Sequence, residues 1–154
     1  MQVEVLNAIY ENDLPKIRQL LDSSNVDNPL TTYLHRPLHF AVRTQNKSLI
    51  EFLVKELNAQ VNCADINGWS PLGLIAVEGT DKNYELAQLL ISLGADVDYS
   101  TRASNYYSPM ELASDNRDNA PEVFKLFRTF SKNQFWEIRK SFLFCFERLS
   151  QKVF

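Results

Sequence analysis

A short phrase that recurs three times is the feature that most constrains how this chain can fold. Each copy has a proline, then an apolar residue, and an alanine a few residues later, at residues 36–41, 70–76 and 108–113. The prolines of these copies, Pro37, Pro71 and Pro109, lie 34 and 38 residues apart. Self-similarity at a period of about 20–50 residues is typical of stacked repeats. We therefore expect several copies of one small unit.

Each copy is followed by a second stretch in which apolar residues have helical spacing, at residues 49–54, 86–91 and 123–127. Two units end in a matched closing phrase, at residues 58–62 and 94–98, and an earlier half-copy covers residues 8–21. The apolar face of each helix is too narrow to form a core alone. The pattern therefore predicts helix pairs that stack and bury their faces in one layer.

The residues at the expected helix boundaries agree with this interpretation. The three prolines suit a first helical turn, where a missing N–H costs nothing. Ser70 and Ser108 precede two of them and can accept a free N–H as N-caps, whereas Arg36 cannot, at a cost of ~1 kcal/mol unless another group substitutes. The residues that fall at helix ends and tolerate a left-handed cap are Asn58, Gly79 and Gly94.

These features resemble the ankyrin-repeat family, whose unit of about 33 residues carries a T-P-L-H-x-A signature. The resemblance covers residues 4–130 and includes the signature, the second helix and the closing phrase in the same order. The chain departs from the family pattern in several places. The signature histidine survives only as His39, Asn58 replaces a closing glycine, and extra residues fall near 80–82, near 118–119 and in the loop before Ser108.

The resemblance implies an all-α ankyrin-repeat solenoid, built from helix-turn-helix units with short β-hairpin loops. We expect one domain over residues 1–154, with about four units and a C-terminal capping helix. The expected parts are an N-terminal half-repeat at 1–30, repeats at 31–64, 65–98 and 99–130, and the capping helix at 131–154.

Composition and motifs give no indication of catalysis. The net charge of -3 argues against a nucleic-acid binder driven by overall charge, and the four glycines form no phosphate-binding motif. No hydrolase or metalloprotease motif occurs, so we expect no enzyme, no cofactor and no metal. His35 and His39 have i,i+4 spacing, but Pro37 lies between them, so we interpret His39 as a structural histidine hydrogen-bonded between repeats. We interpret Cys63 as a plain small residue in a turn.

The resemblance also implies a partner-binding surface on the concave side, made by the loop tips and the first helix of each pair. This expectation is an analogy with the fold, so the residues themselves must support it. Tyr and Trp are enriched among binding hot spots. The alternative for Trp69 is that it folds onto the next loop as packing. The candidate partner-binding residues are Tyr33, His35, Arg43, Trp69, Glu78, Tyr106 and Tyr107.

The C-terminal part differs from the rest in charge and aromatic content. Residues 121–154 carry seven basic and three acidic side chains and eight of the ten phenylalanines. The apolar residues at 135, 138, 142, 146, 149 and 153 form one helical stripe, which we expect to close the stack. A candidate second surface consists of Trp136, Leu143 and Phe144. These residues either pack on the preceding helix or meet a partner or a second copy of the chain.

We therefore expect a non-catalytic module that binds another protein through its concave face. Two alternatives stay open: a substrate adaptor of a ubiquitin ligase or other assembly, docked by the C-terminal helix, and a regulatory domain excised from a larger protein. Nucleic-acid binding would require the basic C-terminal segment. The two cysteines and the absence of a signal peptide favour the cytoplasm or nucleus. We expect no membrane insertion, and a monomer rather than a dimer.

Overall fold

The computed structural model describes residues 1–101 and 107–132, and all regular secondary structure in these ranges is helical. The fold is therefore all-α, as the sequence predicts. A π-helical turn, η1 (Phe52–Glu56), continues α4 (Lys47–Glu51), and a 3-10 turn, η2 (Asp81–Asn83), precedes α6 (Tyr84–Ser92). The elements are α1 (Gln2–Tyr10), α2 (Leu14–Leu20), α3 (Pro37–Arg43), α4 (Lys47–Glu51), η1 (Phe52–Glu56), α5 (Pro71–Glu78), η2 (Asp81–Asn83), α6 (Tyr84–Ser92), α7 (Pro109–Asp115) and α8 (Pro121–Phe130).

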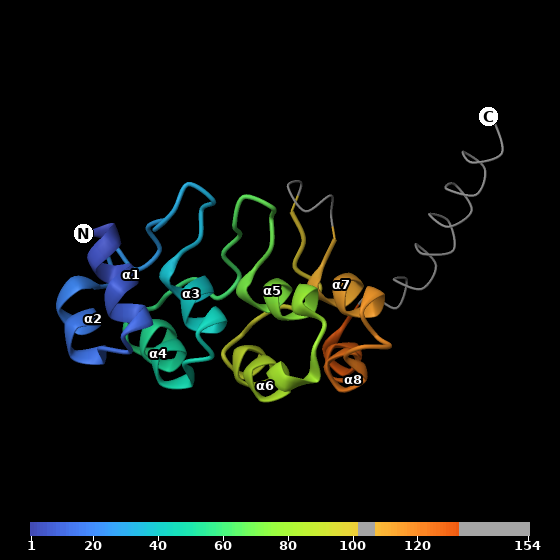
Figure 1. Ribbon diagram of the computed structural model, residues 1–154. Coiled ribbons are helices and arrows are strands. Elements are labelled where there is room, and N and C mark those ends of the chain that lie inside the picture. Colours follow the sequence, from blue (N-terminus) through green and yellow to red (C-terminus); the bar gives the residue numbers. More distant parts are fainter. Residues whose placement is uncertain (102–106, 133–154) are drawn as a thin grey trace.

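The helices form two parallel rows, as Figure 1 shows. The inner row contains α1, α3, α5 and α7, which pack on one another in that order. The outer row contains α2, α4, α6 and α8. A hairpin-shaped loop precedes each of α3 and α5 and projects away from the outer row (Figure 1). No helix in the described ranges is long and apolar enough to cross a membrane.

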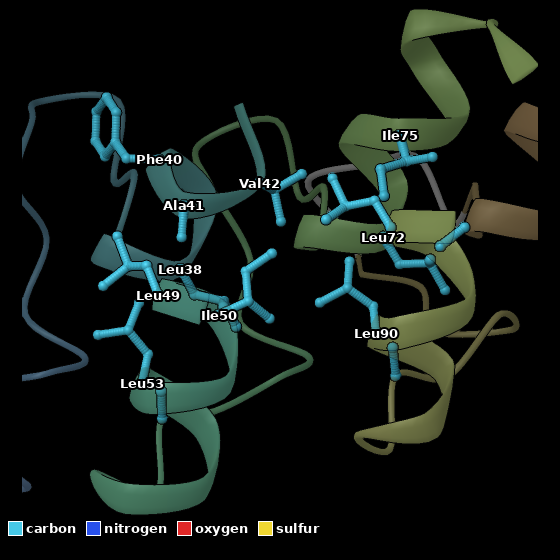
Figure 2. Close-up of a cluster of buried hydrophobic side chains, with 14 of the residues drawn as sticks. Leu38, Phe40, Ala41, Val42, Leu49, Ile50, Leu53, Leu72, Ile75 and Leu90 are labelled. Carbon is cyan, nitrogen blue, oxygen red and sulfur yellow. The ribbon is translucent and has the colours of Figure 1, made fainter. Parts of the chain in front are cut away.

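The buried side chains form one layer that runs through all four helix pairs. Figure 2 shows its centre, where Val42 and Ile50 of the second pair face Leu72 and Leu90 of the third. Most of these side chains are almost completely buried. Full burial of an aliphatic side chain contributes about 1.5–3 kcal/mol. The stack therefore depends on contacts between neighbouring pairs.

The N-termini of the inner helices follow the local chemistry predicted from the sequence. Ser70 Oγ accepts the Gly73 N–H at 3.1 Å. Ser108 Oγ accepts the Glu111 N–H at 3.3 Å, and the Glu111 carboxylate accepts the Ser108 N–H at 2.8 Å. These bonds confirm both serines as N-caps. Arg36 has no side-chain oxygen to cap α3. His39 Nδ1 instead accepts the Arg36 N–H at 3.2 Å, which satisfies one N–H group at the start of this helix.

The three helix ends expected to be left-handed adopt that conformation, with φ of 58° at Asn58, 58° at Gly79 and 97° at Gly94. Gly79 also lies close to the next unit. A Cβ at this position would come within 2.9 Å of Asn116 Cγ. Asn116 donates from Nδ2 to Ala76 O at 2.8 Å and so joins α7 to α5. The glycine therefore makes room for a bond between units.

Side chains near the ends of successive units join neighbouring units at spacings of 33 to 34 residues. Asp27 accepts the Gln60 N–H, Asn62 accepts the Asp96 N–H, and Asp98 accepts the Lys132 N–H at 2.7 Å. A further bond crosses units at α8, where Asp81 Oδ1 accepts the N–H groups of Glu122 and Val123 at 3.0 Å each. The extra residues near 80–82 thus supply an N-cap to the helix of the following unit.

Candidate protein-binding surface

The first two loops are joined to each other at their tips. We define the first loop as residues 28–35 and the second loop as residues 63–69. The Leu30 N–H bonds to His35 O at 2.8 Å within the first loop, and the Asp65 N–H bonds to Trp69 O at 3.0 Å within the second. The Ile66 N–H then bonds to Tyr33 O at 2.9 Å. The two tips are therefore held side by side on the rigid helical stack.

The second loop has the residues that its conformation requires. Asp65 is buried, and its Oδ1 accepts the N–H groups of Asn67 at 2.8 Å and Trp69 at 3.0 Å. Gly68 has a φ of 81°, which glycine adopts without steric cost. Asp65 and Gly68 therefore both stabilise the conformation of the second loop.

The first loop has neither of these residues at the equivalent positions, 34 residues earlier. Thr31 stands in place of Asp65, and its buried Oγ1 has no hydrogen-bond partner among the described residues. Leu34 stands in place of Gly68 and has a φ of 60°. A left-handed conformation costs a non-glycine residue about 1–2 kcal/mol. The first loop therefore adopts the same turn as the second with less favourable residues.

The three aromatic residues proposed for the loops differ in their exposure. Tyr33 is 62% exposed at the first tip. Trp69, at the base of the second loop, and Tyr107, just before α7, are partly buried. The backbone of Trp69 is also fixed on both sides, because its N–H binds Asp65 and its carbonyl accepts from His39 Nε2 at 3.2 Å. Tyr33 is thus the most accessible of the three.

His35 is turned inward between the two loops. Its side chain is 14% exposed, and its Nε2 lies 3.4 Å from Asp65 Oδ2. Its ring packs edge-on against Phe40 at 5.6 Å and lies 5.7 Å from the ring of His39. His35 therefore contributes to the packing between loops and presents little surface to a partner.

His39 is completely buried and uses both ring nitrogens within the fold. Nδ1 accepts the Arg36 N–H, which leaves the proton on Nε2 to be donated to Trp69 O of the next unit. Burial lowers the pKa of His39 to about 4, so the ring is neutral at physiological pH. These bonds confirm the predicted structural role between repeats. In the described ranges no three His, Cys, Asp or Glu side chains are placed to hold a metal ion.

Cys63 lies beside this histidine, with Sγ 3.8 Å from His39 Nδ1. The thiol is free and buried, and burial raises its pKa to about 12. A thiol with so high a pKa forms almost no thiolate near neutral pH and is a poor nucleophile. This agrees with the interpretation of Cys63 as a small packing residue.

The two charged candidates lie at the C-terminal ends of inner helices. Arg43 is exposed at the end of α3, and Glu78 is exposed at the end of α5, where its carboxylate accepts a hydrogen bond from Asn83. Val77, beside Glu78, is also exposed. The inner row of helices therefore carries a cation at the end of α3 and an anion at the end of α5.

Four of the predicted residues, Tyr106, Trp136, Leu143 and Phe144, lie outside the described residues. Sequence reasoning missed two others in the loops, Leu34 and Ile66, which are 44% and 50% exposed. A signal for Leu34 was present in the repeat alignment, because it occupies the position of Gly68. Ile66 has no comparable signal, since an isoleucine in a loop is as compatible with burial as with exposure.

Stacked helix pairs linked by hairpin-shaped loops define this protein as a repeat solenoid. A family model described as ankyrin repeats in three copies matches residues 5–101. The chain therefore belongs to the ankyrin-repeat family. No curated protein matches the chain. Ankyrin repeats are in general non-catalytic modules that bind other proteins.

Proposed function

We propose that this protein binds another protein, without catalysis, through the loop tips and the exposed face of the inner helices. The observation that carries the proposal is the exposure of Tyr33 at the tip of a loop that is hydrogen-bonded to its neighbour. A large aromatic side chain on a fixed backbone loses little conformational freedom on binding. Such residues dominate the free energy of many protein interfaces.

The groups best suited to chemistry support a role without catalysis. Both nitrogens of His39 are engaged within the fold, and the Cys63 thiol is buried with a raised pKa. A general base must reach the proton that it removes, and a nucleophile must be exposed and activated. Neither residue meets these requirements.

We further propose that the protein acts as a monomer in the cytoplasm or nucleus. The free thiol of Cys63 is compatible with the reducing conditions of both compartments. In the adaptor alternative, the C-terminal helix docks the chain on a larger assembly. In the regulatory-domain alternative, the chain is part of a larger protein. Both would use the same surface for a partner.

The test begins with identification of a partner by affinity purification from the source cell and mass spectrometry. Binding of the purified partner is then measured by calorimetry. Tyr33→Ala and Trp69→Ala should each weaken binding by about 2 kcal/mol, roughly thirty-fold. Gln88→Ala, an exposed position on α6 of the outer row, is the control and should leave the affinity unchanged.

The result that would contradict the proposal is equal binding by wild type and both aromatic variants. Thermal melts of each variant are needed alongside the binding data. If Trp69→Ala loses stability as well as affinity, its indole is packing between loops. Tyr33→Ala then decides the question, because its exposed ring contributes little to the folded core.

A further inference from the structure

We propose that the tips of the first two loops form an apolar docking patch for a short, uncharged, apolar segment of the partner protein. The apolar tip patch consists of Tyr33, Leu34 and Ile66. This inference rests on the proposed function and specifies both the part of the surface that dominates binding and the chemistry of the segment bound there.

The three side chains are exposed together. Tyr33 is 62% exposed, Leu34 is 44% exposed and Ile66 is 50% exposed. The bond from the Ile66 N–H to Tyr33 O, at 2.9 Å, fixes the two tips beside each other. Large apolar side chains that are exposed on adjoining loops have an unfavourable hydration. The largest exposed apolar patch of a typical monomer covers a few hundred Å² and is often functional.

The backbone at Leu34 indicates that its side chain serves something other than stability. Leucine occupies a left-handed position, with φ of 60°, where the second loop has Gly68. Glycine would adopt the same turn without strain. The first loop also lacks the buried carboxylate of Asp65 and has Thr31 in its place. Departures from local structural preference concentrate at functional sites, and here they lead to an exposed leucine.

The electrostatics of the two tips define the chemistry of the partner segment. The exposed residues of the tips are Thr32, Tyr33, Leu34, Ile66 and Asn67, all without charge. The histidine and carboxylate side chains of these loops are turned inward, with His35 14% exposed and Asp65 1% exposed. A charged group placed against the patch would lose its hydration and meet no opposite charge among the described residues of the two tips. The complementary segment is therefore uncharged and apolar.

The size of the patch sets the kind of partner. Three partly exposed side chains offer only a few hundred Å² of apolar surface, whereas a stable protein dimer needs about 800 Å² on each side. A second copy of the chain docked patch to patch would bury too little area. A short segment of another protein, inserted over the tips while its neighbouring residues contact the inner helices, fits the available surface.

The proposal can be tested with a displayed library of short linear peptides, selected against the full chain. Selected peptides are synthesised, and their affinities are measured by calorimetry. We expect their common core to be apolar and without charge. Leu34→Gly removes the apolar side chain together with the backbone strain, so it should weaken peptide binding at least about tenfold while the melting temperature stays close to that of the wild type. Ile66→Ser should weaken binding similarly.

Phe130→Ala is the matched control, because Phe130 is 54% exposed on α8 of the outer row, away from the first two loops (Figure 1). It should leave the affinity unchanged. The inference is overturned if Leu34→Gly and Ile66→Ser bind the selected peptides as the wild type does, if the selected cores are charged, or if no peptide is enriched above an unrelated protein. If Trp69→Ala or Glu78→Ala weakens binding in the same assay while Leu34→Gly does not, the proposed function stands and only the apolar tip patch is wrong.

Discussion

Replacement of Gly79 by alanine tests how the third and fourth units are joined. Gly79 has a φ of 58°, which alone costs a non-glycine residue about 1–2 kcal/mol. An alanine Cβ would also lie 2.9 Å from Cγ and 3.0 Å from Oδ1 of Asn116. The Asn116 side chain would have to move, and its bonds to Ala76 O at 2.8 Å and Leu112 O at 3.4 Å would be lost or weakened. At about 0.5–1.5 kcal/mol for each bond, Gly79→Ala should lower the free energy of unfolding by about 2–5 kcal/mol in total.

The assay is urea unfolding of single and double variants. Asn116→Ala removes the bonds to Ala76 and Leu112 in advance, so adding Gly79→Ala should then cost less than it does in the wild type. The alanine Cβ at position 79 would still lie 3.1 Å from the Cβ of residue 116, so part of the destabilisation would remain. We expect a coupling free energy of about 1 kcal/mol between the two sites.

Gly94→Ala is the matched control for this cycle. Its φ is 97°, but nothing lies within 4 Å of a Cβ built there. It should destabilise the chain through the backbone alone and should be additive with Asn116→Ala to within about 0.5 kcal/mol. Additivity of Gly79→Ala with Asn116→Ala would refute the reasoning, because it would mean that the crowding of Asn116 does not contribute to the loss.

Three further predictions concern stability. Phe52→Ala, in the buried layer, should lower the free energy of unfolding by ~3–5 kcal/mol in denaturant titrations, and a loss below about 1 kcal/mol would contradict its placement. The pKa of His39 is about 4 in the folded protein and 6.5 when exposed, so only the unfolded chain gains a proton as the pH falls through this window. Stability should therefore fall by about 2 kcal/mol from roughly pH 7 to pH 5, and the slope should flatten in His39→Gln. Deletion of residues 134–154 should lower the melting temperature and promote aggregation, because their apolar stripe is predicted to cover the last unit; an unchanged melting temperature would mean that this segment is not a cap.

Features set by local chemistry were predictable from the sequence. Ser70 and Ser108 cap their helices through bonds to residues three positions away, so the sequence contains both partners. The left-handed end at Asn58 follows from its place after an apolar helix. The stacking of pairs follows from the repeat spacing, since units of equal length with equal apolar faces bury them only against one another.

Features that depend on a neighbouring unit were not predictable in the same way. Tyr33 and Trp69 are both loop aromatics, yet one is exposed and the other is partly buried, and the Trp69 backbone is held by Asp65 and by His39 of the previous unit. From the sequence, Arg36 is expected to cost its helix ~1 kcal/mol unless another group substitutes, but the sequence does not identify that group. The compensating ring belongs to His39, whose orientation is fixed by its second bond to Trp69 O.

The cap that Asp81 supplies to α8 limits how this protein can be rearranged by gene duplication or by design. Units of a solenoid are often treated as interchangeable modules, because each contacts only its neighbours. Here α8 begins at Pro121 without a side-chain cap of its own, and the acceptor for its Glu122 and Val123 N–H groups is carried by the preceding unit. A copy inserted between residues 98 and 107 would separate donor from acceptor unless it repeated the insertion at 80–82. The third and fourth units are therefore expected to be inherited, and transplanted, as a pair.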